Sequence, residues 1–492
     1  MVSASSHRFE DFDAVARRER VGAEAGTRNH VPVHGYGDAP AFQPQRLDEL
    51  LDGAAGRNIV GLTIDEKSKL CVAHGRSTRH WHPLQATGGV ARVSNRRCEL
   101  PSMFDNVQLG AQPGMPDGKR LIERPTLAAV DLDAVRANFA EARRRAEGRI
   151  VIAVVKADAY GHGATAVARR LAEAGCEQLA VLTVEEGCEL REAGLELPIL
   201  VLGGVHGDCE LALERGLTPV LHHAGHLERV AKLARGRGER VAVQVEVDTG
   251  MRRMGVPPDE AEALLAGVAA EPALRLEGVY THLARADEPE LEPSLEQLAA
   301  FRRVLAAARA RGITPPLVHC ANSPGLLVGR QLFEALPEAN AVRPGLMLYG
   351  VLPAPHLEAR LRPAMTLRTR VAHVRQLREG DAVGYAALFR AQRPTRVATL
   401  PLGYADGVPI AASNRGSVMI DGRRHPIVGR VSMDFVTVDV GDAPVEIGDA
   451  AILFGAGAAG RLPVEEAAEA ARTISYELLV RVGSRVPRVV EG

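Results

Sequence analysis

The alternation of hydrophobic and polar positions becomes regular near residue 124. From there to about residue 350, short apolar runs alternate with amphipathic stretches of helical period, which is typical of repeated βα units. The apolar runs predict strands at about 150–156, 178–183, 197–202, 217–221, 240–248, 275–281, 316–320 and 341–349. These eight units predict an α/β fold with a closed (β/α)8 TIM barrel, and a doubly wound open sheet is the alternative.

After about residue 353 the helical period fades, and apolar and polar residues alternate as they do in antiparallel strands. The alternating segments are 365–377, 396–402, 417–431 and 436–440. One amphipathic stretch, 464–482, predicts a helix near the carboxyl end. We therefore expect a mainly β C-terminal domain after the barrel.

Residues 1–122 show neither pattern, because their apolar stretches are short and interrupted by Gly and Pro. The HWH sequence around Trp81 could be a metal site, but no second cluster at ligand spacing accompanies it, and we expect no metal. We interpret this segment as an irregular or disordered extension. The expected domains are thus the extension (1–122), the barrel (123–355) and the C-terminal β domain (356–492).

The composition of the chain argues against several classes of function. The 60 Lys and Arg residues balance 61 Asp and Glu residues, which argues against a general electrostatic grip on nucleic acid or anionic lipid. The chain has no apolar run of about 20 residues and does not start like a signal peptide, so we expect a cytoplasmic protein that spans no membrane. The six cysteines show no metal-ligand spacing and are predicted to be reduced thiols.

Lys156 is the first candidate for chemistry. It ends a predicted barrel strand, precedes the Gly-rich turn ADAYGHGA, and is one of only five lysines in the chain. A lysine shielded from water at the carboxyl rim of a barrel has a lowered pKa and forms a Schiff base with an aldehyde. A surface lysine with a solvated ammonium group is the alternative.

Polar clusters also follow the later predicted strands. They are VDTGMRRMG with Arg253, THLA with His282, HCANS with Ser323, and VRPGLMLYG with Arg343. Each cluster alone has a structural explanation, such as a buried histidine or an ion pair. Because the carboxyl ends of barrel strands meet at one rim, we expect the clusters to converge on one pocket.

These motifs, followed by PLGYADG (401–407) and VGRVSMD (428–434), resemble the bacterial, pyridoxal-phosphate-dependent alanine racemase family over residues 124–491. The resemblance implies a barrel, a C-terminal β domain and a homodimer in which each active site lies between the barrel of one chain and the β domain of the other. It implies pyridoxal 5'-phosphate as the cofactor and a small amino acid as the substrate.

The resemblance also implies residue roles. Lys156 would hold the cofactor and act as one catalytic base, and Tyr404 of the partner subunit would act as the second, so that protons leave and return on opposite faces. Arg343 would face the pyridine nitrogen with support from His282. Because an arginine does not give up its proton at working pH, that nitrogen would stay unprotonated and transamination would be suppressed.

The remaining implied roles concern binding. The phosphate would be bound by Tyr160, Ser323 and the backbone of Gly345 and Leu346. The substrate carboxylate would be bound by Arg253 and the backbone of Met433.

Two positions depart from the family pattern. Many members have a lysine, often carbamylated, where this chain has Glu246, and a carboxylate there supplies the same negative charge. Some members have a phosphate-binding tyrosine where this chain has Ser484, and Tyr476 lies too far from that motif to be assigned.

The preferred function is an isomerase reaction, the interconversion of L-alanine and D-alanine, which supplies D-alanine for the peptidoglycan of the cell wall. A broad-specificity racemase acting on serine, lysine or arginine is the close alternative, because one or two pocket residues separate such substrates. A basic amino-acid decarboxylase is disfavoured because those enzymes place an acidic group where this chain has Arg343. A non-catalytic pyridoxal-phosphate carrier would resemble the barrel alone, so the β domain with Tyr404 argues against it.

Overall fold

The computed structural model describes residues 124–204, 207 and 209–492, and the backbone of four strands nearer the amino terminus. The chain forms two compact units, Met1–Lys119 and Arg120–Gly492. In the first unit the four strands form one antiparallel sheet in the order β1 (Ile59–Ile64), β2 (Leu70–His74), β3 (Trp81–Thr87), β4 (Val90–Val93). The sequence pattern did not predict these strands, and Pro83 inside β3 illustrates why, since proline is rare within strands. The rest of the expected extension and the HWH side chains lie outside the described residues.

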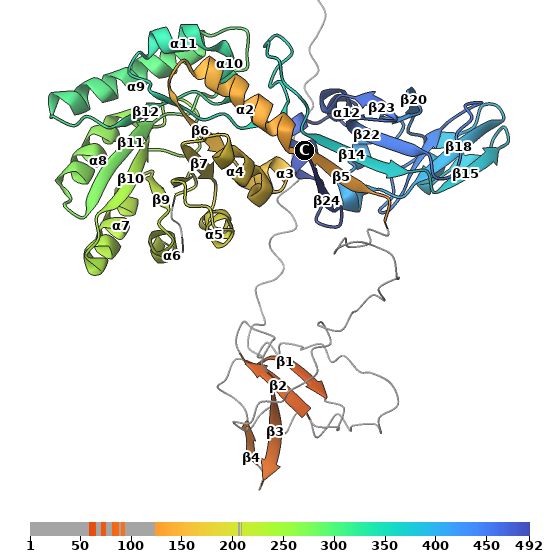
Figure 1. Cartoon of the computed structure of the whole chain (residues 1–492), viewed down its shortest axis with the longest axis horizontal. Helices are drawn as coiled ribbons and strands as arrows, with labels where there is room; N and C mark the ends of the chain where they lie inside the picture. Colours follow the sequence, from red (N-terminus) through yellow and green to blue (C-terminus); the bar gives the residue numbers. More distant parts are fainter. Residues whose placement is uncertain are drawn as a thin grey trace, which may run out of the picture. The chain divides into compact units, whose positions relative to one another are not determined.

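Eight parallel strands form a closed barrel in the second unit, as predicted, and helices surround it (Figure 1). In chain order the strands are β6 (Ile150–Val154), β7 (Gln178–Val181), β8 (Ile199–Val201), β9 (Thr218–Leu221), β10 (Val241–Glu246), β11 (Leu274–Tyr280), β12 (Leu317–His319) and β13 (Ala341–Val342). The helices are α2 (Leu132–Ala146), α3 (Lys156–Gly161), α4 (Ala164–Glu173), α5 (Val184–Glu192), α6 (Cys209–Glu214), α7 (Ala224–Arg237), α8 (Pro258–Ala270), α9 (Glu292–Ala310), α10 (Ser323–Val328) and α11 (Arg330–Ala335). Most buried side chains of the barrel are Val, Ile, Leu and Ala, and a few polar ones, such as Gln244 and His319, are also fully buried.

The last barrel strand is much shorter than the predicted 341–349. The ladder of β13 ends at Val342, and the chain continues through Pro344 into the 3-10 helix η1 (Leu346–Tyr349). Proline lacks the N–H group that a strand ladder needs, so the apolar run cannot continue as a strand. The loop and η1 instead bring backbone N–H groups to the carboxyl rim of the barrel.

The C-terminal part is mainly β, as predicted. Its largest sheet has the order β20-β19-β22-β14-β5-β24, with β23 paired to β22, and two smaller sheets contain β15-β18-β21 and β16-β17. The strands are β14 (Met365–Arg370), β15 (His373–Leu377), β16 (Ala382–Val383), β17 (Phe389–Arg390), β18 (Thr395–Leu400), β19 (Ser417–Ile420), β20 (Arg423–Pro426), β21 (Val436–Asp439), β22 (Ala450–Gly457), β23 (Gly460–Leu462) and β24 (Arg488–Glu491).

Two details of this part differ from expectation. Strand β5 (Leu127–Asp131), within the range assigned to the barrel, pairs antiparallel with β14 and parallel with β24, so it belongs to the large β sheet. The helix expected over 464–482 is two helices, α12 (Val464–Ala470) and α13 (Ser475–Val480). The break contains Arg472 with φ 54°, a left-handed conformation that cannot continue an α-helix.

Two sequence expectations about the whole chain concern cysteines and membrane helices. The cysteines with described side chains, Cys176, Cys188, Cys209 and Cys320, form no disulfide bonds, while those of Cys71 and Cys98 lie outside the description. Within the described part of the chain, no helix has the length and apolar character needed to cross a bilayer.

Candidate functional site

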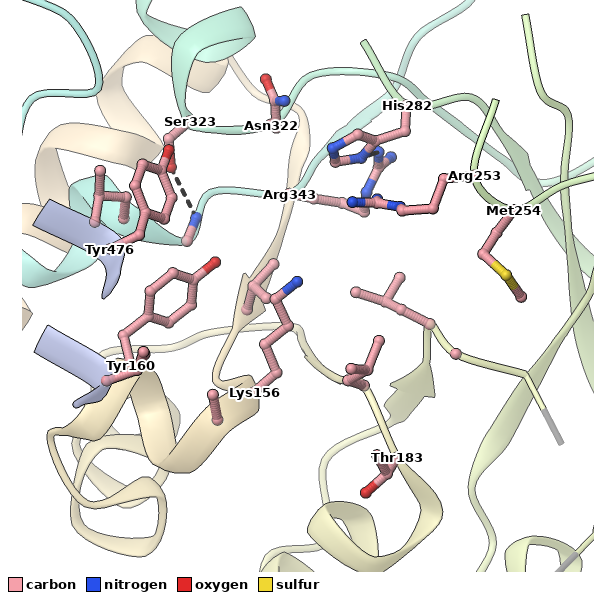
Figure 2. A pocket seen from close by; sticks show the side chains of 18 of the residues that line it. Lys156, Tyr160, Thr183, Arg253, Met254, His282, Asn322, Ser323, Arg343 and Tyr476 are labelled. Carbon is pink, nitrogen blue, oxygen red and sulfur yellow. Dashed lines mark hydrogen bonds between the residues drawn. The ribbon is translucent and has the colours of Figure 1, made fainter. Parts of the chain in front are cut away.

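A cavity of about 1060 Å³ lies at the carboxyl ends of the barrel strands. Figure 2 shows that side chains from separate parts of the sequence surround this space. The predicted site residues that line it are Lys156, Tyr160, Arg253, His282, Ser323, Arg343, Gly345 and Leu346. Tyr404 and Met433 do not line it. The barrel therefore collects the predicted cofactor residues in one place, and the two residues of the β domain lie elsewhere in the same chain.

The turn that carries Lys156 has an unusual backbone. The next four residues, 157–160, all have φ between 52° and 54°, a left-handed conformation that costs about 1–2 kcal/mol for each non-glycine residue. Glu186 in α5 accepts a hydrogen bond of 2.6 Å from the N–H of Ala157. Gly161 ends the turn, where a Cβ atom would lie 2.5 Å from the carbonyl oxygen of Leu479 in α13. Contacts with α5 and α13 thus hold a strained turn, as is frequent at functional sites.

The amine of Lys156 sits in a place that disfavours its charge. Burial lowers the pKa of Lys156, and the positive charge of Arg253 lowers it further. Figure 2 shows the Lys156 side chain extending into the cavity between Tyr160 and Arg343. A neutral amine is the form that attacks an aldehyde, so this environment favours covalent attachment of a carbonyl compound.

Arg343 is a buried cation whose side chain is held on several sides. Its Nη1 lies 2.6 Å from Nδ1 of His319, and its Nη2 donates to the carbonyl oxygen of Thr281 at 3.0 Å. Nη2 also lies 3.3 Å from Nδ1 of His282. Burial, with the nearby charge of Arg343, lowers the pKa of His282 to about 3. His282 is therefore neutral and accepts a hydrogen bond from the guanidinium group.

Hydroxyl and N–H groups gather at another end of the cavity. The Ser323 hydroxyl oxygen accepts hydrogen bonds from the N–H groups of Gly345 and Met347 at 2.9 and 3.3 Å. A Cβ atom at Gly345 would lie only 2.4 Å from the Tyr160 hydroxyl oxygen, so glycine leaves the room that this approach needs. The Tyr476 ring lies 6.2 Å from the Tyr160 ring, centre to centre. Neutral donors of this kind fit a phosphate group.

Arg253 lies on the other side of Lys156 from Tyr160 and Ser323 (Figure 2). Arg253 lines the cavity and forms no hydrogen bond or ion pair with the residues that the structure describes. Nearby, Oε2 of Glu246 accepts a hydrogen bond of 3.0 Å from the Tyr280 hydroxyl and lies 3.1 Å from Nε2 of His222. An unpaired guanidinium group in a cavity is suited to binding a carboxylate in two-point fashion.

Tyr404 and Met433 lie on two turns that contact each other. The N–H of Tyr404 donates to the carbonyl oxygen of Ser432 at 3.0 Å, and the N–H of Ala405 donates to that of Met433 at 3.1 Å. A Cβ atom at Gly403 would lie 2.3 Å from the Ser432 carbonyl oxygen, so this approach requires glycine. The side chains of Tyr404 and Met433 are 43% and 51% exposed, which leaves both available to another chain.

Sequence reasoning missed one residue that lines the cavity, Tyr476, and one that holds the Lys156 turn, Glu186. Tyr476 lines the cavity, whereas Ser484, considered for the same role, is exposed and does not line it. Tyr476 had a weak signal, because tyrosine occurs only seven times in the chain. Glu186 had a clearer one, because Thr183 and Glu186 have the spacing of a capping box, which the structure contains at the start of α5.

Comparison with known proteins agrees with this geometry. The family models that match are "Alanine racemase, N-terminal domain" over residues 130–353 and "Alanine racemase, C-terminal domain" over residues 364–490. The chain is 42% identical to an alanine racemase of Desulforamulus reducens over 378 residues, which are 75% of this chain and 100% of that protein. It is also 42% identical to an alanine racemase of Sorangium cellulosum, over 74% of this chain and 98% of the relative.

Solved structures show the same similarity. The alanine racemase of D-cycloserine-producing Streptomyces lavendulae superimposes with a TM-score of 0.71 at 40% identity, covering 75% of this chain and 97% of the other. The alanine racemase of Bartonella henselae, solved with covalently bound pyridoxal phosphate, superimposes with a TM-score of 0.68 at 31% identity, covering 75% of this chain and 99% of the other.

Proposed function

This chain belongs to the alanine racemase family, and from that premise we propose that it interconverts L-alanine and D-alanine by a two-base mechanism and supplies D-alanine for peptidoglycan. The family and its solved structures identify it as an enzyme whose cofactor is pyridoxal phosphate. The observation that carries the proposal is the desolvated amine of Lys156 in one cavity with the guanidinium of Arg253, which has no ion-pair partner among the described residues. The first group suits the cofactor aldehyde, and the second suits an amino-acid carboxylate.

The residues of the cavity match the parts of the cofactor. When bound, pyridoxal phosphate supplies a ring that withdraws electrons and makes the Cα–H bond of an attached amino acid acidic. We assign its aldehyde carbon to Lys156 and its pyridine nitrogen to Arg343, with His282 behind. We assign its phosphate to the hydroxyls and N–H groups of Tyr160, Ser323, Gly345, Leu346 and Tyr476.

Proton transfer needs one base on each face of the amino acid Cα. We propose that the Nζ atom of Lys156 takes or returns the proton on one face. The hydroxyl of Tyr404 of the partner subunit would serve the other face. Two facts support a contribution across a homodimer, namely that Tyr404 lies outside the cavity of its own chain and that exposed apolar residues surround its turn. Those residues include Met433 and Phe435, each about half exposed, and grouped exposed apolar side chains are typical of interfaces.

Arg343 and His282 have a role in limiting side reactions. A guanidinium group donates hydrogen bonds but does not transfer its proton. His282 is neutral, so it is not a source of protons for this group either. The ring nitrogen opposite Arg343 would therefore stay unprotonated, which limits electron withdrawal to what proton exchange at Cα requires.

The test is chiral analysis of purified enzyme incubated with pyridoxal phosphate and, separately, with L-alanine, L-serine, L-lysine and L-arginine. We expect D-alanine to form fastest and an equal mixture of alanine enantiomers at equilibrium. Lys156→Ala should abolish the activity, and the matched control Lys232→Ala, at an exposed lysine of α7, should preserve it. Faster conversion of another amino acid would overturn alanine as the substrate, and no D-amino acid from any of them would overturn the racemase reaction.

A further inference from the structure

A line of polar groups leads from Arg343 into the barrel interior, toward the amino ends of the strands. Nη1 of Arg343 lies 2.6 Å from Nδ1 of His319, and Nε2 of His319 lies 2.8 Å from Oε1 of Gln244. Nε2 of Gln244 donates to Oε2 of Glu277 at 3.2 Å. The side chains of His319 and Gln244 are fully buried, and neither residue lines the cavity. Four segments, the loop after β13 and strands β12, β10 and β11, each contribute one group.

Chemistry fixes the direction of every hydrogen bond in this line. Arginine only donates, so Nδ1 of His319 must accept. Burial and the nearby charge of Arg343 hold the pKa of His319 well below its usual value, so the ring is neutral and its single N–H is on Nε2. That N–H donates to the amide oxygen of Gln244, and the amide NH2 then faces the acceptor-only carboxylate of Glu277. A cation at one end and an anion at the other thus determine the tautomer of His319 and the orientation of Gln244.

Packing leaves these side chains little freedom. A Cβ atom at Gly278 would lie 3.0 Å from Cδ of Gln244, so glycine makes room for the amide. The Tyr280 ring stacks on the His319 ring with centres 4.8 Å apart and an angle of 15°. The guanidinium carbon of Arg343 lies 4.5 Å from the centre of the same Tyr280 ring. The imidazole and the guanidinium therefore share one rigid neighbour, and a change in the imidazole is transmitted to Arg343.

We propose that Gln244 and Glu277 are positioning residues that keep His319 in the Nε2–H tautomer and thereby hold Arg343 as a pure hydrogen-bond donor toward the cofactor ring. This inference rests on the proposed function, which places Arg343 opposite the ring nitrogen. If Gln244 is lost, the buried Nε2–H of His319 has no acceptor, and the Nδ1–H tautomer becomes competitive. In that tautomer Nδ1 and the guanidinium both donate, so Arg343 must move away from its place at the ring.

The first experiment compares wild-type holoenzyme with Gln244→Met, which removes both hydrogen-bonding groups and keeps a similar length. The matched control is Gln178→Met, at another buried barrel glutamine that lies outside the line and the cavity. We expect Gln244→Met to change the absorbance spectrum of the bound cofactor, to raise the fraction of keto acid formed per D-alanine, and to lower kcat by about tenfold or more with little change in KM. Glu277→Met should act in the same direction. The control should resemble wild type in spectrum and product ratio.

The variant Arg343→Lys distinguishes the positioning role of Gln244 from the placement of Arg343 opposite the ring nitrogen. If that variant changes the spectrum and a folded Gln244→Met does not, the positioning role is overturned while the placement of Arg343 stands. If neither variant changes the spectrum, the placement of Arg343 in the proposed function fails.

A second measurement reads the tautomer of His319 directly in the wild-type protein. In cofactor-free wild-type protein with 15N-labelled histidine, the ring nitrogens of His319, assigned by their loss in His319→Gln, should show a protonated Nε2 and an unprotonated Nδ1 between pH 6 and 9. A protonated Nδ1 would overturn the proposal.

Discussion

Asp406 offers a direct test of how the Tyr404 turn is held. Its carboxylate is fully buried and accepts hydrogen bonds from Nη1 and Nη2 of Arg124 at 2.6 and 2.7 Å. It also accepts the N–H of Gly403 at 2.9 Å, and Nε of Arg485 lies 3.2 Å away. One carboxylate therefore joins the start of the folded unit, the turn that carries Tyr404 and a segment near the carboxyl end.

The substitution Asp406→Asn removes this charge and keeps the shape. Breaking a buried ion pair by neutralising one partner costs about 3–5 kcal/mol, and the low end applies because the Arg124 side chain is 28% exposed. At about 2 °C per kcal/mol for a large chain, a loss of about 3 kcal/mol lowers the thermal midpoint by about 6 °C. The Tyr404 turn keeps its backbone hydrogen bonds to Ser432 and Met433 but loses its ion pair with Arg124, so kcat should fall while cofactor absorbance stays at the wild-type level.

The assay is thermal unfolding by circular dichroism together with steady-state racemisation. Asp442→Asn is the matched control, because Asp442 is an exposed aspartate of the same domain, and it should leave both quantities unchanged. The reasoning would be refuted if Asp406→Asn had a thermal midpoint within about 1 °C of wild type and an unchanged kcat. The ion pair would then neither stabilise the fold nor position the Tyr404 turn.

Three further predictions concern other parts of the chain. Glu246→Gln should raise KM for alanine, because the cavity lined by Arg253 loses a negative charge, and wild-type activity should not respond to added bicarbonate; an unchanged KM would exclude a role for Glu246 in substrate binding. A chain without residues 1–119 should keep nearly all activity, because Arg120–Gly492 is a compact unit by itself, and loss of cofactor from the shortened chain would contradict this. Burial lowers the pKa of His162 to about 4 and of His282 to about 3 from 6.5, so protonation favours the unfolded chain. The contribution of these two histidines to the free energy of unfolding should therefore be fully present above pH 6.5 and should decrease as the pH falls toward 4. Thermal midpoints measured over this pH range should decrease less for His162→Gln than for wild type.

The sequence predicted the barrel and most of the site for a physical reason. Parallel barrel strands expose their carboxyl ends at one rim, so a polar residue that ends an apolar run, such as Lys156 or Arg343, points to the site without knowledge of tertiary structure. Ser323 and Gly345, which we propose bind the phosphate, were predicted from the resemblance of their motifs to those of the family.

Other features depend on contacts that a linear pattern does not contain. Tyr476 reaches the cavity because α13 packs against the Lys156 turn at Gly161, a contact between distant segments. Strand β5 belongs to the β domain because it pairs with β14 on one edge and with β24 on the other. The apolar pattern of β5 alone does not say which strands it will pair with. The helix expected over 464–482 divides because a single residue, Arg472, adopts a left-handed φ.

The central claim is that each active site combines Lys156 of one chain with Tyr404 of the partner subunit. Lys156→Ala should lose covalently bound cofactor, and Tyr404→Phe should bind cofactor normally yet racemise very slowly, so each homodimer should be nearly inactive. A heterodimer of the two variants contains one site with both bases intact if the β domain reaches across the two-fold axis. The decisive measurement is the racemisation rate of heterodimers purified through two different tags. Recovery of a substantial share of the wild-type rate, up to about half, is the predicted result. Heterodimers as inactive as the two parents would contradict the shared two-base site.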